Sequence, residues 1–253
     1  MASATLIAAL TLAALVSLSA VEGWAWLKME SGLTRIGWLL AWLATGLLII
    51  NLIGWGLARR HIPPVSLDEV LIALTMAILL IYLGLKANFR SPGASFCLGL
   101  PATLLLAAWA YWFWPGTPQL GREPLWLWGL LARWVLITGI AGLYWLALLS
   151  GLSWRRDPYL QQTLLFETEP ALTLSKQLLS AVLLIFFLGG LMVMGRAWWG
   201  WGQPAGQNLI LVVVFLLLLA AWWLRFTWPQ RRWWTWSLII LAFVAALPAL
   251  TVI

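Results

Sequence analysis

Long apolar runs dominate the chain, and short polar segments separate them. Eight of these runs are long enough to cross a hydrocarbon layer of roughly 30 Å as helices. They lie near residues 5–26, 36–57, 69–85, 94–113, 125–149, 172–194, 208–224 and 233–253. The runs do not alternate between polar and apolar positions, and a helix satisfies its own backbone hydrogen bonds in lipid. The pattern predicts an all-α polytopic membrane bundle of about eight transmembrane helices, forming a single transmembrane domain over residues 1–253.

The composition supports a lipid environment. Of the 253 residues, 63% are hydrophobic and 9% are charged, whereas soluble domains carry about 25% charged residues. The net charge of +7 is spread over short loops rather than gathered in a stripe, which argues against nucleic acid as a partner. Single copies of cysteine (Cys97) and histidine (His61) exclude an internal disulfide and a metal site built from several histidines. We therefore expect an integral membrane protein with no metal site and the lipid bilayer as its solvent.

The distribution of basic residues predicts the orientation. The first run is expected to be a helix rather than a signal peptide, because no basic residue precedes it. With eight helices, the loops on one side hold Lys28, Arg35, Lys86, Arg90, Arg155, Arg156, Lys176, Arg225, Arg231 and Arg232. The loops on the other side hold Arg59, Arg60, Arg122 and Arg196. The positive-inside rule then predicts that both termini lie outside.

Few residues offer chemistry. No GxSxG, HExxH or phosphate-binding loop occurs, and the carboxylates lie near the ends of the apolar runs, so we expect no enzyme. Arg133 is the basic residue that lies well inside an apolar run, about two turns from its start. It either reaches the interface or pairs with a loop acid such as Glu123, or its guanidinium meets an anionic ligand group. Ser66, Asp68 and Glu69 are expected to provide an N-cap and an acidic first turn for the third helix.

Tryptophan is unusually frequent, with 22 copies. Most of them fall near predicted helix ends, as expected of an aromatic belt at the membrane surface. Trp198, Trp199 and Trp201 differ, because they lie among glycines in the predicted outward loop 195–208. A loop of indoles and glycines could hold a flat ligand by stacking. His61 lies in another outward loop and is either an interfacial residue or a haem ligand.

Several segments, taken in order, resemble the cytochrome c assembly family of haem-handling membrane proteins (the CcsA, CcmC and HemX-like group). "HIPPVSLDE", from His61 to Glu69, is similar to the family segment H-x-P-x-x-x-L-x-E. "GRAWWGWGQP" is similar to its W-x-W-D-P loop, with Trp199 and Trp201 as the paired tryptophans. "TWPQRRWWTW" resembles its W-R-G-[KR]-R segment before the last helix. The chain resembles a divergent member that lacks most of the haem-ligand histidines, because Arg133 occupies the place of one and no histidine precedes "TWPQRR". Gly202 also occupies the place of the aspartate.

The resemblance implies a non-catalytic role in haem handling or cytochrome c maturation. The implied site consists of Trp198, Trp199, Trp201, Arg133 and His61, with haem as the cofactor and an apocytochrome c as a partner. The implied location is the bacterial inner membrane, or a thylakoid or other energy-transducing membrane. Two alternatives remain open. The chain could be an accessory subunit of a respiratory or photosynthetic complex, or a transporter, although only Asn51 and a few hydroxyl residues lie inside helices to line a path.

Overall fold

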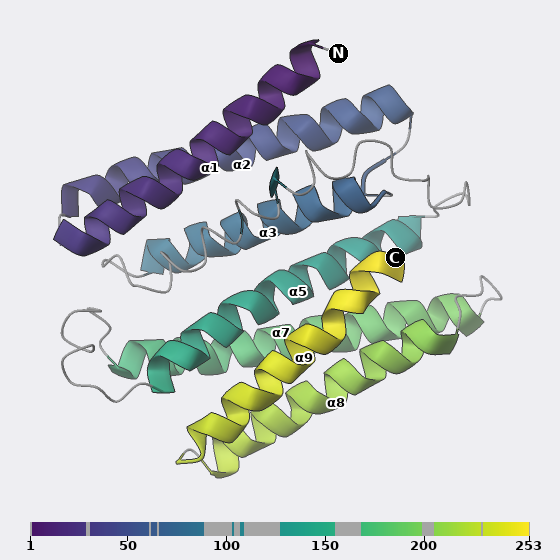
Figure 1. Cartoon of the computed structure of the whole chain (residues 1–253). Coiled ribbons are helices and arrows are strands. Elements are labelled where there is room, and N and C mark those ends of the chain that lie inside the picture. Colours follow the sequence, from purple (N-terminus) through teal and green to yellow (C-terminus); the bar gives the residue numbers. More distant parts are fainter. Residues whose placement is uncertain are drawn as a thin grey trace. The chain divides into compact units, whose positions relative to one another are not determined.

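The structure is a computed structural model that describes residues 2–28, 31–60, 62–64, 66–88, 103, 107–108, 127–154, 168–198, 205–228 and 230–252. Seven helices account for nearly all of these residues, and no strand occurs among them (Figure 1). The helices are α1 (Ala2–Lys28), α2 (Ser31–Arg59), α3 (Leu67–Asn88), α5 (Leu127–Trp154), α7 (Thr168–Trp198), α8 (Ala205–Thr227) and α9 (Arg232–Val252). The predicted all-α class is confirmed.

Six of these helices are long and apolar enough to cross a membrane, namely α1, α2, α3, α5, α7 and α8. A shorter apolar stretch, Arg232–Pro248, belongs to α9. The predicted helix at 94–113 lies almost wholly outside the described residues. Three of its residues are described, Thr103, Ala107 and Ala108, and each is helical. The protein is therefore a helical protein of the membrane type, while the count of eight helices and the orientation of the termini stay predictions.

Several helices extend beyond the apolar runs that predict them at both ends. For example, the run 5–26 lies within Ala2–Lys28, and the run 172–194 lies within Thr168–Trp198. Polar residues at the ends continue each helix, because leaving the helix would expose backbone groups that lipid cannot satisfy. The predicted loop 195–208 is correspondingly shorter. Its first four residues belong to α7 and its last four to α8.

The chain forms two compact units, and α1, α2 and α3 belong to the first. In this unit α2 contacts both α1 and α3 (Figure 1). Two side-chain hydrogen bonds join the helices in the core. Asn51 Nδ2 on α2 donates to Thr11 Oγ1 on α1 at 3.1 Å, and the Tyr82 hydroxyl on α3 donates to Glu22 Oε1 on α1 at 2.8 Å. Whether the two units together form the single predicted domain over residues 1–253 stays a prediction.

The second unit is a four-helix bundle in which each helix runs antiparallel to the next. Helix α5 contacts α7 and α9, and α8 completes the ring by contacting both α7 and α9. Glycines allow the close approach of α5 to α7. A Cβ atom on Gly142 would lie 2.7 Å from Val182 Cγ2, and one on Gly139 would lie 2.9 Å from Phe186 Cε2. Trp236 Nε1 on α9 donates to the Ala147 carbonyl on α5 at 3.1 Å.

Each end of this bundle collects particular residues. One end, here called the Arg133 end, contains the start of α5, the end of α7 and the start of α8. The opposite end, here called the Arg225 end, contains the start of α7, the end of α8 and the start of α9. In the predicted orientation the Arg133 end faces outward and the Arg225 end faces the cytoplasm.

Candidate functional site

Arg133 lies in the second turn of α5, as the sequence predicts, and its residue is only 9% exposed. The surrounding stretch of α5 is apolar, with Ala132, Leu136 and Ile137 all buried. A guanidinium at this depth is costly unless charges or hydrogen-bond acceptors face it. Its five donors allow it to hold an anionic ligand together with a protein partner. The proposed pairing with Glu123 falls outside the described residues.

The tryptophan segment, which we define as Trp198–Trp201, begins at the same end of the bundle as Arg133. Gly189 on α7 packs against α5, because a Cβ atom there would lie 3.3 Å from both Val135 Cγ1 and Leu136 Cδ2. From Gly189, α7 continues to its last residue, Trp198. The backbone of Trp198 therefore lies at the Arg133 end. Two of the predicted site residues, Arg133 and Trp198, therefore lie at the same end of the bundle.

The other predicted site residues are not placed. Trp199, Trp201 and His61 lie outside the described residues, as does the side chain of Trp198. Within the tryptophan segment, the structure places the backbone of Trp198 in α7. Trp198 is therefore the last residue of a helix, whereas the sequence predicts a loop at this position.

A second polar region, which the sequence only partly predicts, lies in the first unit between α2 and α3. We call Arg59, Ser66, Asp68 and Glu69 the Arg59 cluster. Arg59 Nη2 lies 2.6 Å from Asp68 Oδ2, and Arg59 Nη1 lies 2.9 Å from Glu69 Oε1. The same Nη1 atom donates to Ser66 Oγ at 2.6 Å, and the Arg59 guanidinium stacks over Trp55 at 5.2 Å.

The Arg59 cluster confirms that Asp68 and Glu69 form an acidic first turn for α3. The Ser66 carbonyl accepts a hydrogen bond from the Val70 amide at 2.9 Å, and the Ser66 amide donates to Glu69 Oε2 at 3.4 Å. Ser66 thus occupies the N-cap position, but its hydroxyl accepts from Arg59. The cluster ties the end of α2 to the start of α3. Each charged group of the Arg59 cluster has a partner, so the cluster is a structural contact between the two helix ends.

Glu22 is a second fully buried acid of the first unit besides Glu69, and the sequence pattern places it near the end of its apolar run. Glu22 and Tyr82 are both fully buried, and the contact between them joins helices that are distant in the sequence. Asn51 is 3% exposed and donates to Thr11 Oγ1 and to the Leu47 carbonyl. An acid within an apolar run is the sequence signal that could have identified this region, since such residues are rare in membrane spans.

A haem site needs side chains that bind the iron and side chains that bind the two carboxylates. Among the described residues, no group of three or more histidine, cysteine or acidic side chains could hold a metal ion. Among the predicted site residues, Arg133 is the described one that fits the anionic edge of haem. Haem would bring redox and ligand-binding chemistry, while Arg133 would bind and orient its carboxylates.

The chain was also compared with known proteins. No protein-family model, no curated protein and no solved structure matches it.

Proposed function

We propose that this chain is a non-catalytic integral membrane protein of haem handling or cytochrome c maturation. The proposed site is the Arg133 end of the four-helix bundle. The observation that carries the proposal is the juxtaposition of buried Arg133 with the start of the tryptophan segment at Trp198. The resemblance of the segments around His61 and Trp199 to the cytochrome c assembly family supports the same function.

The chemistry of haem suits this arrangement. Haem combines a flat apolar ring with two carboxylate side chains, so it needs both aromatic surface and positive charge. Arginine binds carboxylates through paired hydrogen bonds, which are strongest where water is excluded. Indole rings offer a stacking surface that is apolar yet tolerates the polar headgroup layer. In this proposal the chain presents haem at the outer face to an apocytochrome c.

The test is an absorption spectrum of the detergent-purified protein, oxidised and reduced, with a pyridine haemochrome assay and a hemin titration. We expect a Soret band, and we expect Arg133→Leu to weaken hemin binding by roughly tenfold through the loss of a charge-assisted contact. Arg35→Leu is the matched control, because Arg35 is an exposed arginine near the start of α2, far along the helix from the proposed site residues. A spectrum without a Soret band, both before and after adding hemin, would contradict the proposal.

A second candidate function is that of an accessory subunit in a larger membrane complex. Gly46 and Gly54 lie two turns apart on α2, and a Cβ atom on either would have nothing within 4 Å. Ile50 and Ile53 nearby are more than half exposed. Small residues on such a face allow another helix to approach closely. Copurification with a fixed stoichiometry would support this candidate, and Gly46→Leu together with Gly54→Leu should then abolish it.

A further inference from the structure

The Arg225 end of the four-helix bundle holds a buried cation in an unusual setting. Arg225 lies near the end of α8 and is 5% exposed. Its Nη2 atom donates a hydrogen bond of 3.0 Å to Ser175 Oγ on α7, and Ser175 is 2% exposed. Both ion pairs found in the described part of the chain belong to Arg59, so no described carboxylate neutralises Arg225.

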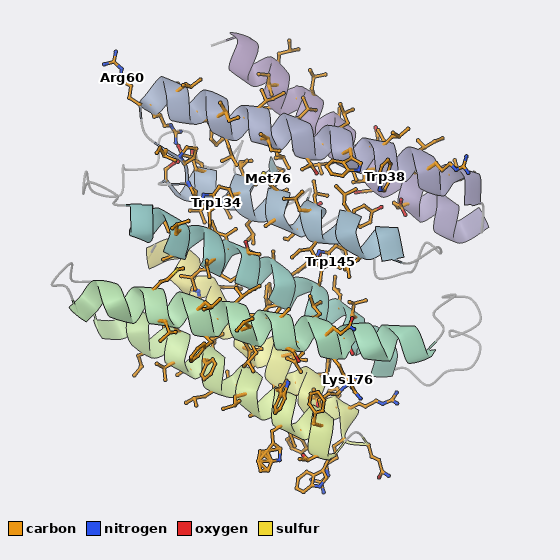
Figure 2. All side chains as sticks on the ribbon, turned by 180° about the vertical axis from the view of Figure 1, so that it is seen from behind. Trp38, Arg60, Met76, Trp134, Trp145 and Lys176 are labelled. Carbon is orange, nitrogen blue, oxygen red and sulfur yellow. The ribbon has the colours of Figure 1, made fainter. Side chains whose placement is uncertain are left out.

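Neighbouring groups increase the positive charge at this end. Arg232, at the start of α9, acts on Arg225 as a like charge. The Lys176 ammonium lies 5.6 Å from the centre of the Phe226 ring, and the Arg231 guanidinium lies 4.9 Å from that of Trp228. Figure 2 shows Lys176 at this end of α7. Four basic side chains therefore converge where three helices end or begin.

A buried arginine that is repelled by like charge and held by one hydroxyl is poorly compensated within the protein. A guanidinium has five donors in a planar fork, and Ser175 uses one of them. The remaining donors match the oxygens of a phosphate group, which binds arginine through paired, charge-assisted hydrogen bonds. Thr235, in the first turn of α9, also has a buried hydroxyl with no hydrogen-bond partner among the described residues.

The apolar surroundings indicate where such a phosphate would come from. Four tryptophans near this end are strongly exposed, namely Trp223, Trp228, Trp233 and Trp234. Exposed indoles prefer the headgroup layer of a membrane, so they place the Arg225 end at the depth of lipid phosphates. Membrane leaflets with anionic lipids attract basic residues clustered next to transmembrane helices. A lipid phosphate, held in that layer, fits this setting better than a phosphate ion from water.

We propose that Arg225 and Ser175, with Lys176 and Arg231 at the rim, bind the phosphate of an anionic membrane lipid. The site is separate from the Arg133 end, and it does not depend on haem handling. Its arginine neutralises the headgroup, while the exposed tryptophans beside it keep this end of the bundle in the headgroup layer. The bound lipid then supplies the negative charge that the described residues do not.

Native mass spectrometry of the full chain in detergent tests this proposal, with phosphatidylglycerol, phosphatidylcholine and inorganic phosphate added separately. We expect phosphatidylglycerol to bind roughly tenfold more tightly than phosphatidylcholine, because only its headgroup leaves a net negative charge for the arginine. Arg225→Lys should lose most of that preference, since lysine lacks the planar fork. Ser175→Ala should weaken it less, and Arg60→Lys, which changes an exposed arginine elsewhere, should leave it unchanged.

Two results would overturn the proposal. Equal binding of both lipids to the unaltered protein would mean that the Arg225 end does not select an anionic headgroup. Binding of inorganic phosphate as tight as that of phosphatidylglycerol would assign the site to a soluble anion. Arg225→Lys and Ser175→Ala both retain the volume and most of the polarity of the site, so each folded variant reports on recognition. If both variants bind phosphatidylglycerol as the parent does, these residues are not the site.

Discussion

The hydroxyl of Tyr82 donates a 2.8 Å hydrogen bond to Oε1 of Glu22, and both residues are fully buried. The contact links α1 to α3, although α2 is the helix that packs along both of them. A buried carboxylate is costly unless donors surround it, so this bond helps to hold an acid inside an apolar unit. It also fixes how α1 and α3 are positioned along each other.

Tyr82→Phe tests that relationship. The substitution removes the donor and keeps the ring, so little cavity forms around it. We expect the free energy of unfolding to fall by about 1–3 kcal/mol, because the buried Glu22 loses a hydrogen bond. Unfolding of the detergent-solubilised protein, followed by its midpoint, measures this loss. In a Glu22→Gln background the loss should be smaller, since an uncharged acceptor needs the donor less. An equal loss in both backgrounds would show that the two side chains are not coupled.

Arg59→Met tests the Arg59 cluster. It leaves the carboxylates of Asp68 and Glu69, which are 3% and 0% exposed, without their guanidinium partner. Because the Arg59 side chain is 32% exposed, we expect a loss of about 2–4 kcal/mol, between the values for surface and buried pairs. Arg60→Met is the control, since the neighbouring arginine is exposed and makes no ion pair with a described residue. Equal losses in the two variants would contradict a bracing role for the Arg59 cluster.

The sequence predicts the helices well because a membrane demands long apolar segments, and the run 36–57 indeed lies within Ser31–Arg59. It also predicts the start of α3, because Ser66 and the acids after it leave a local signal. The contacts inside each unit leave no such signal. Helices that are apolar on every side do not reveal which face packs inward, so the burial of Glu22 against Tyr82 depends on residues sixty positions apart. For the same reason the sequence places Arg133 in the second turn of its helix but leaves open whether it pairs with a loop acid such as Glu123 or with an anionic ligand group.

Gly142→Ala tests the close packing of α5 on α7. A methyl group there would lie 2.7 Å from Val182 Cγ2, which is buried and has little room to move. We expect a loss of about 1–3 kcal/mol, the usual cost of overpacking a core. Gly190→Ala on α7 is the matched control, because its Cβ atom would have nothing within 4 Å. That variant should be neutral or gain up to about 1 kcal/mol from the better helix propensity of alanine. The opposite order of stabilities would exclude the packing of these two helices as described.

Asn51 is the polar residue that a transporter would most plainly use, and its contacts argue for a structural role instead. Its Nδ2 atom donates to both Thr11 Oγ1 and the Leu47 carbonyl, so both amide hydrogens are engaged. We expect Asn51→Leu to lower the unfolding midpoint by an amount corresponding to about 0.6–1.7 kcal/mol, as for other hydrogen bonds between membrane helices. Thr11→Val should cost a similar amount, and the double variant should cost little more than either, because both changes break the same contact. Ion flux through liposomes that contain the protein should be the same before and after the substitution. A flux that Asn51→Leu abolishes without changing the midpoint would instead place Asn51 on a transport path.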